Sequence, residues 1–401
     1  MNRKSEFVYM TKNEFVKDNS RVFLRACDNY ESDNVSKALG RIFADMGEDA
    51  EIIRDKNVVI KPNLVRKMDI SAAGTTNPIV AEEVAKLCFS LGARSVTIAE
   101  SPAGIYTDSS IRASYKVGKM DIAAENSGAK LNFDLSAKHM QSSGEDKNRV
   151  FNIITPIAEA DVVINICKLK THNLTGMSGA VKNFFGVIPG TEKLEMHALY
   201  PNLTDFSAMI CDLCKTVCES VRTIHVMDAV IGMEGNGPTN GKPKKLGFVG
   251  ASRDPFALDL VAAAVIGMKD LSSTCEEAKK RGYIPEDLSE IEIVGDEYEK
   301  FICEDFLLPD SSDRDRSAIT ILSKLFGGKI MEWLRPRPVV NKDKCVGCGE
   351  CMRSCPAKTI VIKDKIAYIK KSDCIKCFCC QELCPKDAIK VKKNPILKLV
   401  N

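Results

Sequence analysis

The chain has 401 residues, a formal net charge of +3 at pH 7, 6% aromatic residues and 17 cysteines. This length exceeds the size at which one hydrophobic core usually stops growing, so we expect two or three domains. Abundant aliphatic and few aromatic residues favour an α/β protein over an all-β sandwich. The sequence lacks a signal-like amino terminus and any apolar run of about 18 residues, so we expect a cytoplasmic protein with no membrane span, whose cysteines bind metal or clusters rather than form disulfides.

Six short apolar runs have the composition of β-strands, and helical patterns lie between them. The runs are residues 57–61, 95–99, 161–167, 223–227, 246–249 and 291–294. Two helices have clear start signals, Asn77 before Pro78 and Asp254 before Pro255. Alternating strands and helices predict an α/β fold with a mostly parallel sheet and helices on both faces.

Polar residues follow successive predicted strands. They are Lys61 and Asn63, then Glu100 and Ser101, then Lys168, Lys170 and His172, then Asp228, Glu234 and Asn236, then Arg253 and Asp254. In parallel sheets, ligands bind at the carboxyl ends of the strands. We therefore predict that these residues gather at one edge of the sheet, where Lys61, Lys168 and Lys170 bind an anionic small-molecule substrate. The alternative is that they are ordinary solvated side chains.

The loop after the third predicted strand carries Gly176 and Gly179 and leads into a short helix with Lys182 and Asn183. The free N–H groups of that helix are suited to a phosphate or carboxylate, so these four residues and Asn236 complete the predicted substrate site.

Four residues are candidates for catalysis. His172 is a candidate for proton transfer, and a hydrogen bond to a local carbonyl is the alternative. Lys170 is a further catalytic candidate, which would act on the substrate together with His172. Asp228 and Glu234 are candidates for a general base or for ligands of a divalent metal, and stabilisation of turns is the alternative.

Two further segments have more than one interpretation. Cys211, Cys214 and Cys218 lie on one face of a predicted helix and resemble a third cluster site, but small buried thiols are common in cores and we favour a core helix. Residues 318–334 predict a helix docked between domains, with binding to a membrane surface as the alternative.

Two matching cysteine runs lie near the carboxyl end. "CVGCGECMRSCP" begins at Cys345 and "CIKCFCCQELCP" begins at Cys374, and both have the spacing C-x-x-C-x-x-C-x-x-x-C-P. In this pattern three closely spaced thiolates bind one [4Fe–4S] cluster and the fourth ligand comes from the other run. The rule assigns Cys345, Cys348, Cys351 and Cys384 to one cluster and Cys374, Cys377, Cys380 and Cys355 to the other. Cys379 is left over, and structural zinc sites are the alternative.

The charge of this region is strongly basic. Residues 339–393 hold 13 Lys and Arg against 6 Asp and Glu. Only Tyr368 and Phe378 interleave the basic residues and no recognition motif is present, so we do not expect nucleic-acid binding. The lysines would offset the negative clusters and are suited to docking an acidic redox partner, a ferredoxin or flavodoxin-like donor.

The cysteine-rich region resembles bacterial dicluster ferredoxins. The phrases "IKPNL", "INICKLKTH", "GMSGAVKNFFGVIPG", "DAVIGMEGNGP" and "SRDPFALD" resemble the domain of unknown function 362, a family often fused to such ferredoxins in anaerobes. This resemblance implies an iron–sulfur protein of reductive metabolism and no particular reaction. We expect an α/β domain over 1–304, a linker with a docked helix over 305–338, a small α+β ferredoxin-like dicluster domain over 339–393 and a tail over 394–401.

Our leading hypothesis is an anaerobic oxidoreductase that passes electrons from two [4Fe–4S] clusters to the anion at the strand ends. A flavin is a further candidate cofactor, whose site the sequence does not place. No dinucleotide-binding G-x-G-x-x-G follows the first predicted strand and no Walker A motif occurs. The alternatives are a non-catalytic electron carrier or assembly factor, and a redox-neutral carboxylate isomerase with structural clusters.

Overall fold

The computed structural model describes residues 21–268, 272–311 and 335–392. Its helices are α2 (Ser32–Met46), α3 (Glu48–Glu51), α4 (Pro78–Ser90), α5 (Asp108–Val117), α6 (Met120–Ser127), α7 (Thr155–Ala158), α8 (Ala180–Asn183), α9 (Glu192–Leu199), α10 (Leu203–Ser220), α11 (Pro255–Val265), α12 (Ser273–Lys280), α15 (Glu350–Arg353) and α16 (Cys379–Glu382). The helix predicted over 318–334 lies outside the described residues.

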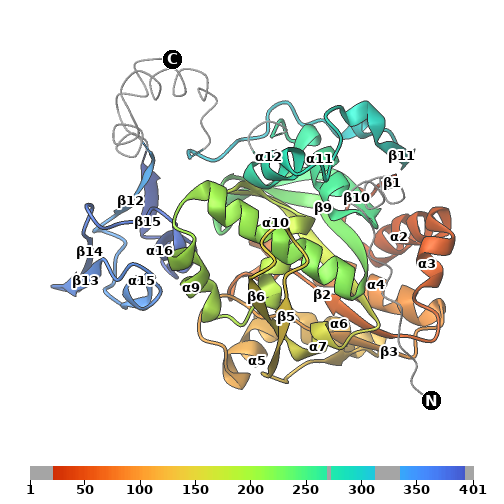
Figure 1. The fold of residues 1–401 in the computed structure, drawn as a ribbon, viewed down its shortest axis with the longest axis horizontal. Helices are drawn as coiled ribbons and strands as arrows, with labels where there is room; N and C mark the ends of the chain where they lie inside the picture. The colour runs from red at the N-terminus through yellow and green to blue at the C-terminus, as the bar shows by residue number, and fades with distance from the viewer. Residues whose placement is uncertain (1–20, 269–271, 312–334, 393–401) are drawn as a thin grey trace.

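The strands of the large sheet are β1 (Arg21–Ala26), β2 (Asn57–Lys61), β3 (Ser95–Ile98), β4 (Lys130–Leu131), β7 (Val162–His172), β8 (Gly176–Ser178), β9 (Arg222–Asn236), β10 (Asn240–Ser252) and β11 (Glu292–Gly295). Their order is β11-β1-β10-β9-β7-β2-β3-β4, and β8 pairs with β7. The five strands β9, β7, β2, β3 and β4 are parallel to one another, and helices cover both faces of the sheet (Figure 1). The predicted α/β class is confirmed.

Two helices begin where the sequence indicated. The side chain of Asn77 accepts a hydrogen bond from the N–H of Ile79, and Pro78 occupies the first turn of α4. The carboxylate of Asp254 accepts from the N–H groups of Phe256 and Ala257 at the start of α11. Both caps satisfy N–H groups that have no partner inside the helix.

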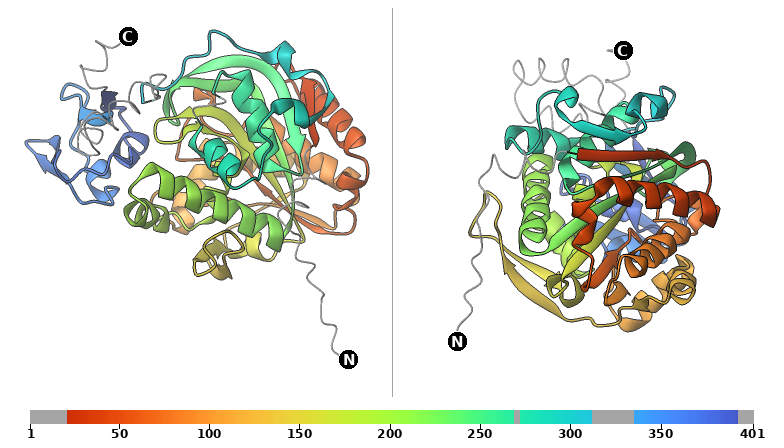
Figure 2. Two further views of the ribbon diagram at one scale, coloured as in Figure 1. Left: turned by 45° about the horizontal axis from the view of Figure 1, so that its top comes forward. Right: turned by 90° about the vertical axis from the view of Figure 1, so that its right-hand side faces the viewer.

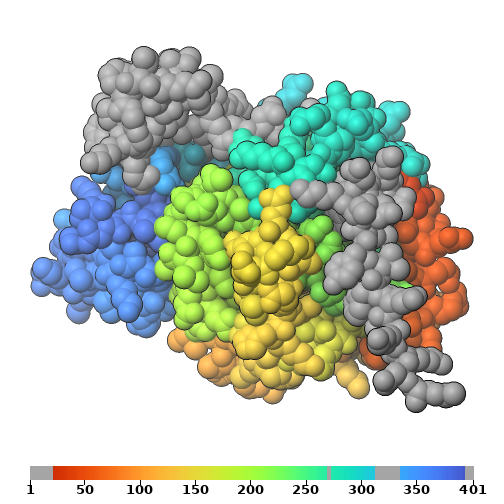
Figure 3. Space-filling view, in the orientation of Figure 1, coloured from red at the N-terminus to blue at the C-terminus, as the bar shows by residue number. Residues whose placement is uncertain are grey.

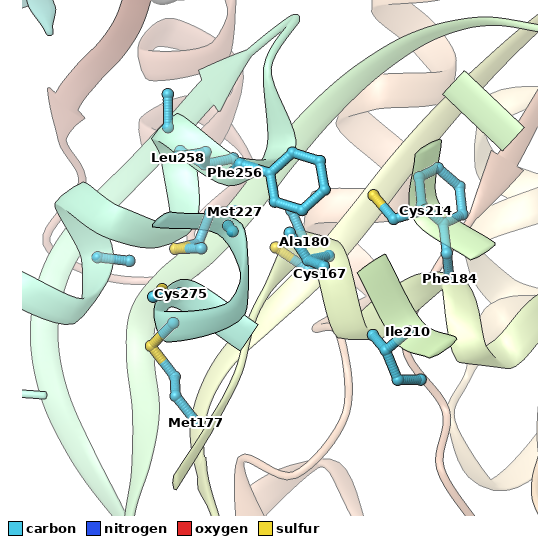
Figure 4. Packing of buried hydrophobic residues seen from close by; sticks show 14 of the residues in the cluster. Cys167, Met177, Ala180, Phe184, Ile210, Cys214, Met227, Phe256, Leu258 and Cys275 are labelled. Carbon is cyan, nitrogen blue, oxygen red and sulfur yellow. The ribbon is translucent and has the colours of Figure 1, made fainter. Parts of the chain in front are cut away.

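Alternate residues of β7 enter different cores. Val163, Cys167 and Leu169 pack under α8, α10 and α11, whereas Ile164 and Ile166 pack under α2 and α4. Figure 4 shows the first of these cores, where Cys167 and Met227 of the sheet meet Phe256 of α11 and Cys214 of α10. Burial on both faces explains why the strand reads as a continuous apolar run.

The sequence did not indicate the direction of one strand. Residues 246–249 belong to β10, which is antiparallel to β9 and β1. Because β9 and β10 form a hairpin, the chain turns back at the glycine-rich segment that follows Asn236, and β10 ends at the opposite edge of the sheet. The prediction that Arg253 and Asp254 join the other polar residues at one edge was therefore wrong.

The dicluster region is a small domain built from two similar halves. Its strands are β12 (Arg337–Val340), β13 (Ile360–Lys363), β14 (Ile366–Ile369) and β15 (Ile389–Lys392), which pair as β12–β15 and β13–β14. Helix α16 faces the large domain near α9, and the β13–β14 hairpin lies at the outer end (Figures 1 and 2). A separate hairpin of the large domain joins β5 (Ala137–Gln141) to β6 (Val150–Ile154). Among the described residues, no helix has the length and apolar character needed to cross a membrane.

Candidate functional site

A cavity of about 670 Å³, counting its open mouth, lies between the large sheet and the dicluster domain. Its walls come from the ends of β2 and β3, from β7, α8 and α9, and from α16 of the dicluster domain. Eight of the predicted polar residues line it, namely Lys61, Asn63, Glu100, Ser101, Lys170, His172, Lys182 and Asn183. The carboxyl-terminal edge of the parallel strands thus forms a polar cavity, closed on one side by the dicluster domain.

Lysines dominate the charge of this cavity. Four lysines line it, Lys61, Lys170, Lys182 and Lys193, against the two carboxylates Glu100 and Glu382. Lys61 pairs with Glu100 at 2.6 Å, and both side chains are buried. The cavity therefore has an excess of positive charge when its lysines are protonated, which favours an anionic ligand.

Neither Lys170 nor Lys182 forms an ion pair with a carboxylate among the described residues. The Lys170 ammonium donates to Asn63 Oδ1 at 2.6 Å and to the Gly74 carbonyl at 2.5 Å. The Lys182 ammonium has no hydrogen bond or ion pair within the described residues, and lies 5.6 Å from the ring centre of Phe185. Burial lowers the pKa of Lys182, and lowers the pKa of Lys170 well below its ordinary value with help from nearby Lys182. A bound anion would favour the protonated form of both.

His172 presents a ring N–H to the cavity. Its Nδ1 accepts from the N–H groups of Leu174 at 3.1 Å and Thr175 at 3.5 Å, so the proton of the neutral ring lies on Nε2. Nε2 is 3.3 Å from Oε1 of Glu382, although that oxygen has no hydrogen bond within the described residues. Burial and the neighbouring Lys182 hold the pKa of His172 well below its usual value. The imidazole is therefore a neutral donor at pH 7.

Lys168 lies outside this cavity. Its ammonium pairs with Asp228 at 2.9 Å and donates to the Tyr30 hydroxyl at 2.7 Å, and Asp228 also accepts from the N–H of Asn77. Residues two positions apart in a regular strand point to the same face, so a regular strand would place Lys168 and Lys170 on one side of the sheet. The pairing of β7 with β9 shifts register between them, so the two ammonium groups have different partners.

Two other predicted residues hold the chain that leads toward the dicluster domain. The Glu234 carboxylate accepts from the N–H of Leu307 at 3.0 Å, and Asn236 donates to Asp310 at 2.8 Å. In the described residues, no three or more of His, Cys, Asp and Glu are arranged to hold a single metal ion.

The start of α8 binds a carboxylate from within the protein. The N–H groups of Ala180 and Val181 donate to Asp259 of α11 at 2.6 and 3.1 Å. A Cβ at Gly179 would lie 2.1 Å from the Asp259 carboxylate, so glycine is needed for this approach. Gly176, the first residue of β8, has φ +81° where the chain turns back from β7. The glycines predicted to cradle a substrate anion instead shape a contact with Asp259 and a tight turn.

Sequence reasoning missed four titratable residues of the cavity. Lys193 and His197 come from α9, and Cys379 and Glu382 come from α16. Lys193 donates to the carbonyl of Ser101, and burial lowers its pKa to about 7. Two features of the sequence could have indicated these residues. Lys193 and His197 have the i, i+4 spacing that places them on one helix face, and Cys379 is a ninth cysteine that the cluster pattern does not use.

The eight patterned cysteines line two smaller cavities. One is lined by Cys345, Cys348, Cys351 and Cys384, and the other by Cys355, Cys374, Cys377 and Cys380. Each cavity therefore contains three cysteines of one run and the last cysteine of the other. Backbone N–H groups point at the thiols, from Ala367 to Cys345, from Thr359 to Cys355 and from Ala388 to Cys384, at 3.3–3.4 Å.

The loops around these cavities have the same backbone shape. Gly347 and Gly349 in the first run, and Lys376 and Phe378 in the second, all have φ between +55° and +78°. Alternation of left-handed and right-handed residues turns successive N–H groups toward one side, as in other anion and iron–sulfur sites. The residues present therefore fit two [4Fe–4S] clusters.

The thiols of α10 belong to the core. Cys211 and Cys214 are fully buried among Phe206, Ile210 and Leu213. Cys218 is partly exposed, with its sulfur 3.8 Å from Nε2 of His225.

Comparison with known proteins agrees with this architecture. Residues 58–264 match the family described as Domain of unknown function (DUF362), and residues 337–385 match the 4Fe-4S dicluster domain. The chain is 26% identical over 267 residues to the "Thylakoid-associated protein sll1697" of Synechocystis sp., covering 65% of this chain and 78% of that protein. The lactate racemase apoprotein of Thermoanaerobacterium thermosaccharolyticum is similar at 15% identity and a TM-score of 0.33, over 56% of this chain and 54% of that chain, so this chain spans about half the racemase's length.

Proposed function

This chain belongs to the DUF362 family and carries a dicluster domain for two [4Fe–4S] clusters, and we propose that it is an oxidoreductase that reduces or oxidises an anionic small molecule bound in the lysine-lined cavity. One observation carries the proposal. Helix α16 contributes Cys379 and Glu382 to that cavity, while Cys377 and Cys380 of the same segment line the second cysteine cavity. A bound anion and a cluster would therefore lie on two sides of one short helix.

The cluster ligands follow the two cysteine cavities. Cys345, Cys348, Cys351 and Cys384 would hold one cluster, and Cys374, Cys377, Cys380 and Cys355 would hold the other. When bound, such clusters supply or accept single electrons. A small ferredoxin or flavodoxin-like protein is the proposed source of these electrons.

The remaining residues bind and orient the ligand. Lys182 and Lys170 provide charge, and Asn63 and Asn183 fix their surroundings through the hydrogen bond from Asn63 Nδ2 to Asn183 Oδ1 at 2.7 Å. The Nε2–H of His172 is placed to donate a hydrogen bond or a proton to the ligand. Phe185, Pro238 and Leu383 supply apolar wall that limits water near it.

A non-catalytic electron carrier is the alternative. It is favoured by the internal partners of Lys61 and Lys170, which satisfy part of the cavity without a ligand. In that case the cavity is only a junction between the domains.

The two functions differ in what the cavity binds. The holoprotein, purified without oxygen, should be titrated calorimetrically with phosphate, sulfate and small dicarboxylates, and its co-purifying molecules should be identified by mass spectrometry. The oxidoreductase should bind at least one of these anions, and the Lys170→Met/Lys182→Met double variant should lose that binding. Absence of anion binding and of any co-purifying acid would support the carrier. The visible spectrum of the same sample shows whether a flavin is present.

A further inference from the structure

The first cysteine cavity lies at the outer end of the dicluster domain, away from the lysine-lined cavity. The dicluster domain forms one end of the molecule, and its β13–β14 hairpin, which contributes Ile362 and Ala367 to this cavity, points away from the large sheet (Figures 1 and 3). Cys348 is exposed at this cavity, and Val346, which also lines it, is 54% exposed. Met352 on α15 is 41% exposed. Two large apolar side chains thus stand in solvent beside the first cluster site.

Lysines surround these apolar side chains. Lys386 lines the first cysteine cavity, and the backbone of Lys365 lies so close to Gly347 that a Cβ there would come within 2.6 Å. Lys344 directly precedes Cys345. All three lysines are exposed, and none has an ion pair within the described residues.

The neighbouring acidic residues are partly neutralised. Glu350 pairs with Arg353 at 2.8 Å, and Asp387 pairs with Arg66 of the large domain at 3.4 Å. Asp343 and Asp364 remain exposed near the lysines. Across residues 337–392, Lys and Arg number 13 against 6 Asp and Glu, so the domain as a whole is basic.

We propose that this outer surface, formed by Lys344, Val346, Met352, Lys365 and Lys386, docks a small acidic one-electron carrier protein. An apolar centre with a charged rim is the usual composition of a specific protein interface. Opposite charge on the partner accelerates association and makes it sensitive to salt. The inference rests on the proposed oxidoreductase for its biological role, because it assigns the outer cluster site to the carrier and the inner one to the anion.

The experiment uses the anaerobic holoprotein and a fluorescently labelled bacterial flavodoxin as the acidic probe. Binding is followed by anisotropy at low and at moderate ionic strength. We expect salt-sensitive binding that the Lys344→Glu/Lys365→Glu variant weakens at least tenfold at low salt. Met352→Ala should weaken binding by a similar factor at both salt concentrations, because its contribution is apolar.

A matched variant separates the effect of this surface on binding from the effect of the protein's net charge. Lys37→Glu/Lys116→Glu makes the same change in net charge on exposed positions of α2 and α5 in the large domain, and should alter affinity less than twofold. Equal weakening by both pairs, or no binding of flavodoxin to the wild-type protein, would overturn the docking surface.

Anion binding in the same variants keeps the two proposals distinguishable. Calorimetric titration with the anion that the wild type binds should be unchanged in Lys344→Glu/Lys365→Glu, since both positions lie outside the lysine-lined cavity. If the wild type binds the anion but not flavodoxin, the docking surface alone is refuted. If it binds flavodoxin but no anion, the proposed function alone is refuted.

Discussion

Replacing Lys182 by Met should separate ligand binding from fold stability. Its ammonium has no hydrogen bond or ion pair within the described residues, so the loss of this charge removes no internal contact of that kind. A hydrogen bond to a charged group contributes about 1.5–3 kcal/mol, which corresponds to roughly 10- to 150-fold weaker anion binding. Stability without ligand should stay equal or rise, because a partly buried charge is no longer desolvated.

Lys61→Met is the matched contrast. Lys61 and Glu100 form a buried pair at 2.6 Å, and removal of one partner leaves the other as an uncompensated buried charge. Such a change costs about 3–5 kcal/mol of folding free energy. Lys61→Met should therefore lower stability even without anion, unlike Lys182→Met.

The assay is denaturant unfolding of the anaerobic protein with and without a saturating anion at equal ionic strength. At 100 times its dissociation constant, the anion stabilises the wild type by about 2.7 kcal/mol, and a 10- to 100-fold loss of affinity removes about 1.3–2.3 kcal/mol of this. If Lys182→Met keeps the full anion response, or destabilises the free protein as much as Lys61→Met does, the assignment of Lys182 as an unpaired anion-binding residue is incorrect.

Three further predictions follow from the same structure. Burial lowers the pKa of Lys193 to about 7, so between pH 7 and its ordinary pKa the folded state binds fewer protons than the unfolded state, and the folding free energy lost to this buried charge is regained as pH rises. Because an anion binds the protonated lysine better, calorimetry from pH 6 to 8 should show anion affinity falling through pH 7 in the wild type and a flatter pH profile in Lys193→Met. Iron and sulfide analysis should give about eight of each per chain, unchanged in Cys379→Ser, whereas Cys355→Ser should alter the paramagnetic resonance of the cluster bound by Cys374, Cys377 and Cys380. Cys211→Ala/Cys214→Ala should keep that iron content and lower stability by about 1–3 kcal/mol, as expected for core thiols, whereas loss of four irons would make α10 a cluster site.

The sequence was sufficient for the fold class and the helix starts, because these depend on local patterns. The continuous apolar run at the start of β7 and the Asn77–Pro78 and Asp254–Pro255 caps are visible without tertiary information. The direction of β10 was not predictable in the same way, since a strand of the same composition pairs in either direction. Its antiparallel pairing with β9 depends on the short turn that joins them.

The composition of the cavity was only partly predictable. Strand ends identified Lys61 and Lys170, but the partners of Lys168 and the start of α8 come from residues distant in sequence, Tyr30, Asp228 and Asp259. The contribution of Glu382 depends on how two domains dock, which no local pattern encodes. Hydrogen bonds between them, from Asn173 to Gln381 and from Thr239 to the Glu382 carbonyl, fix that arrangement.

The central claim is that the anion cavity and the second cluster lie on two sides of α16. A potentiometric titration of the reduced holoprotein, followed by electron paramagnetic resonance with and without the bound anion, tests it most directly. We expect the anion to lower the reduction potential of the cluster held by Cys374, Cys377, Cys380 and Cys355, because negative charge nearby disfavours reduction, and to affect the outer cluster less. Lys182→Met should abolish the shift. Equal potentials with and without an anion that calorimetry shows to be bound would contradict the account.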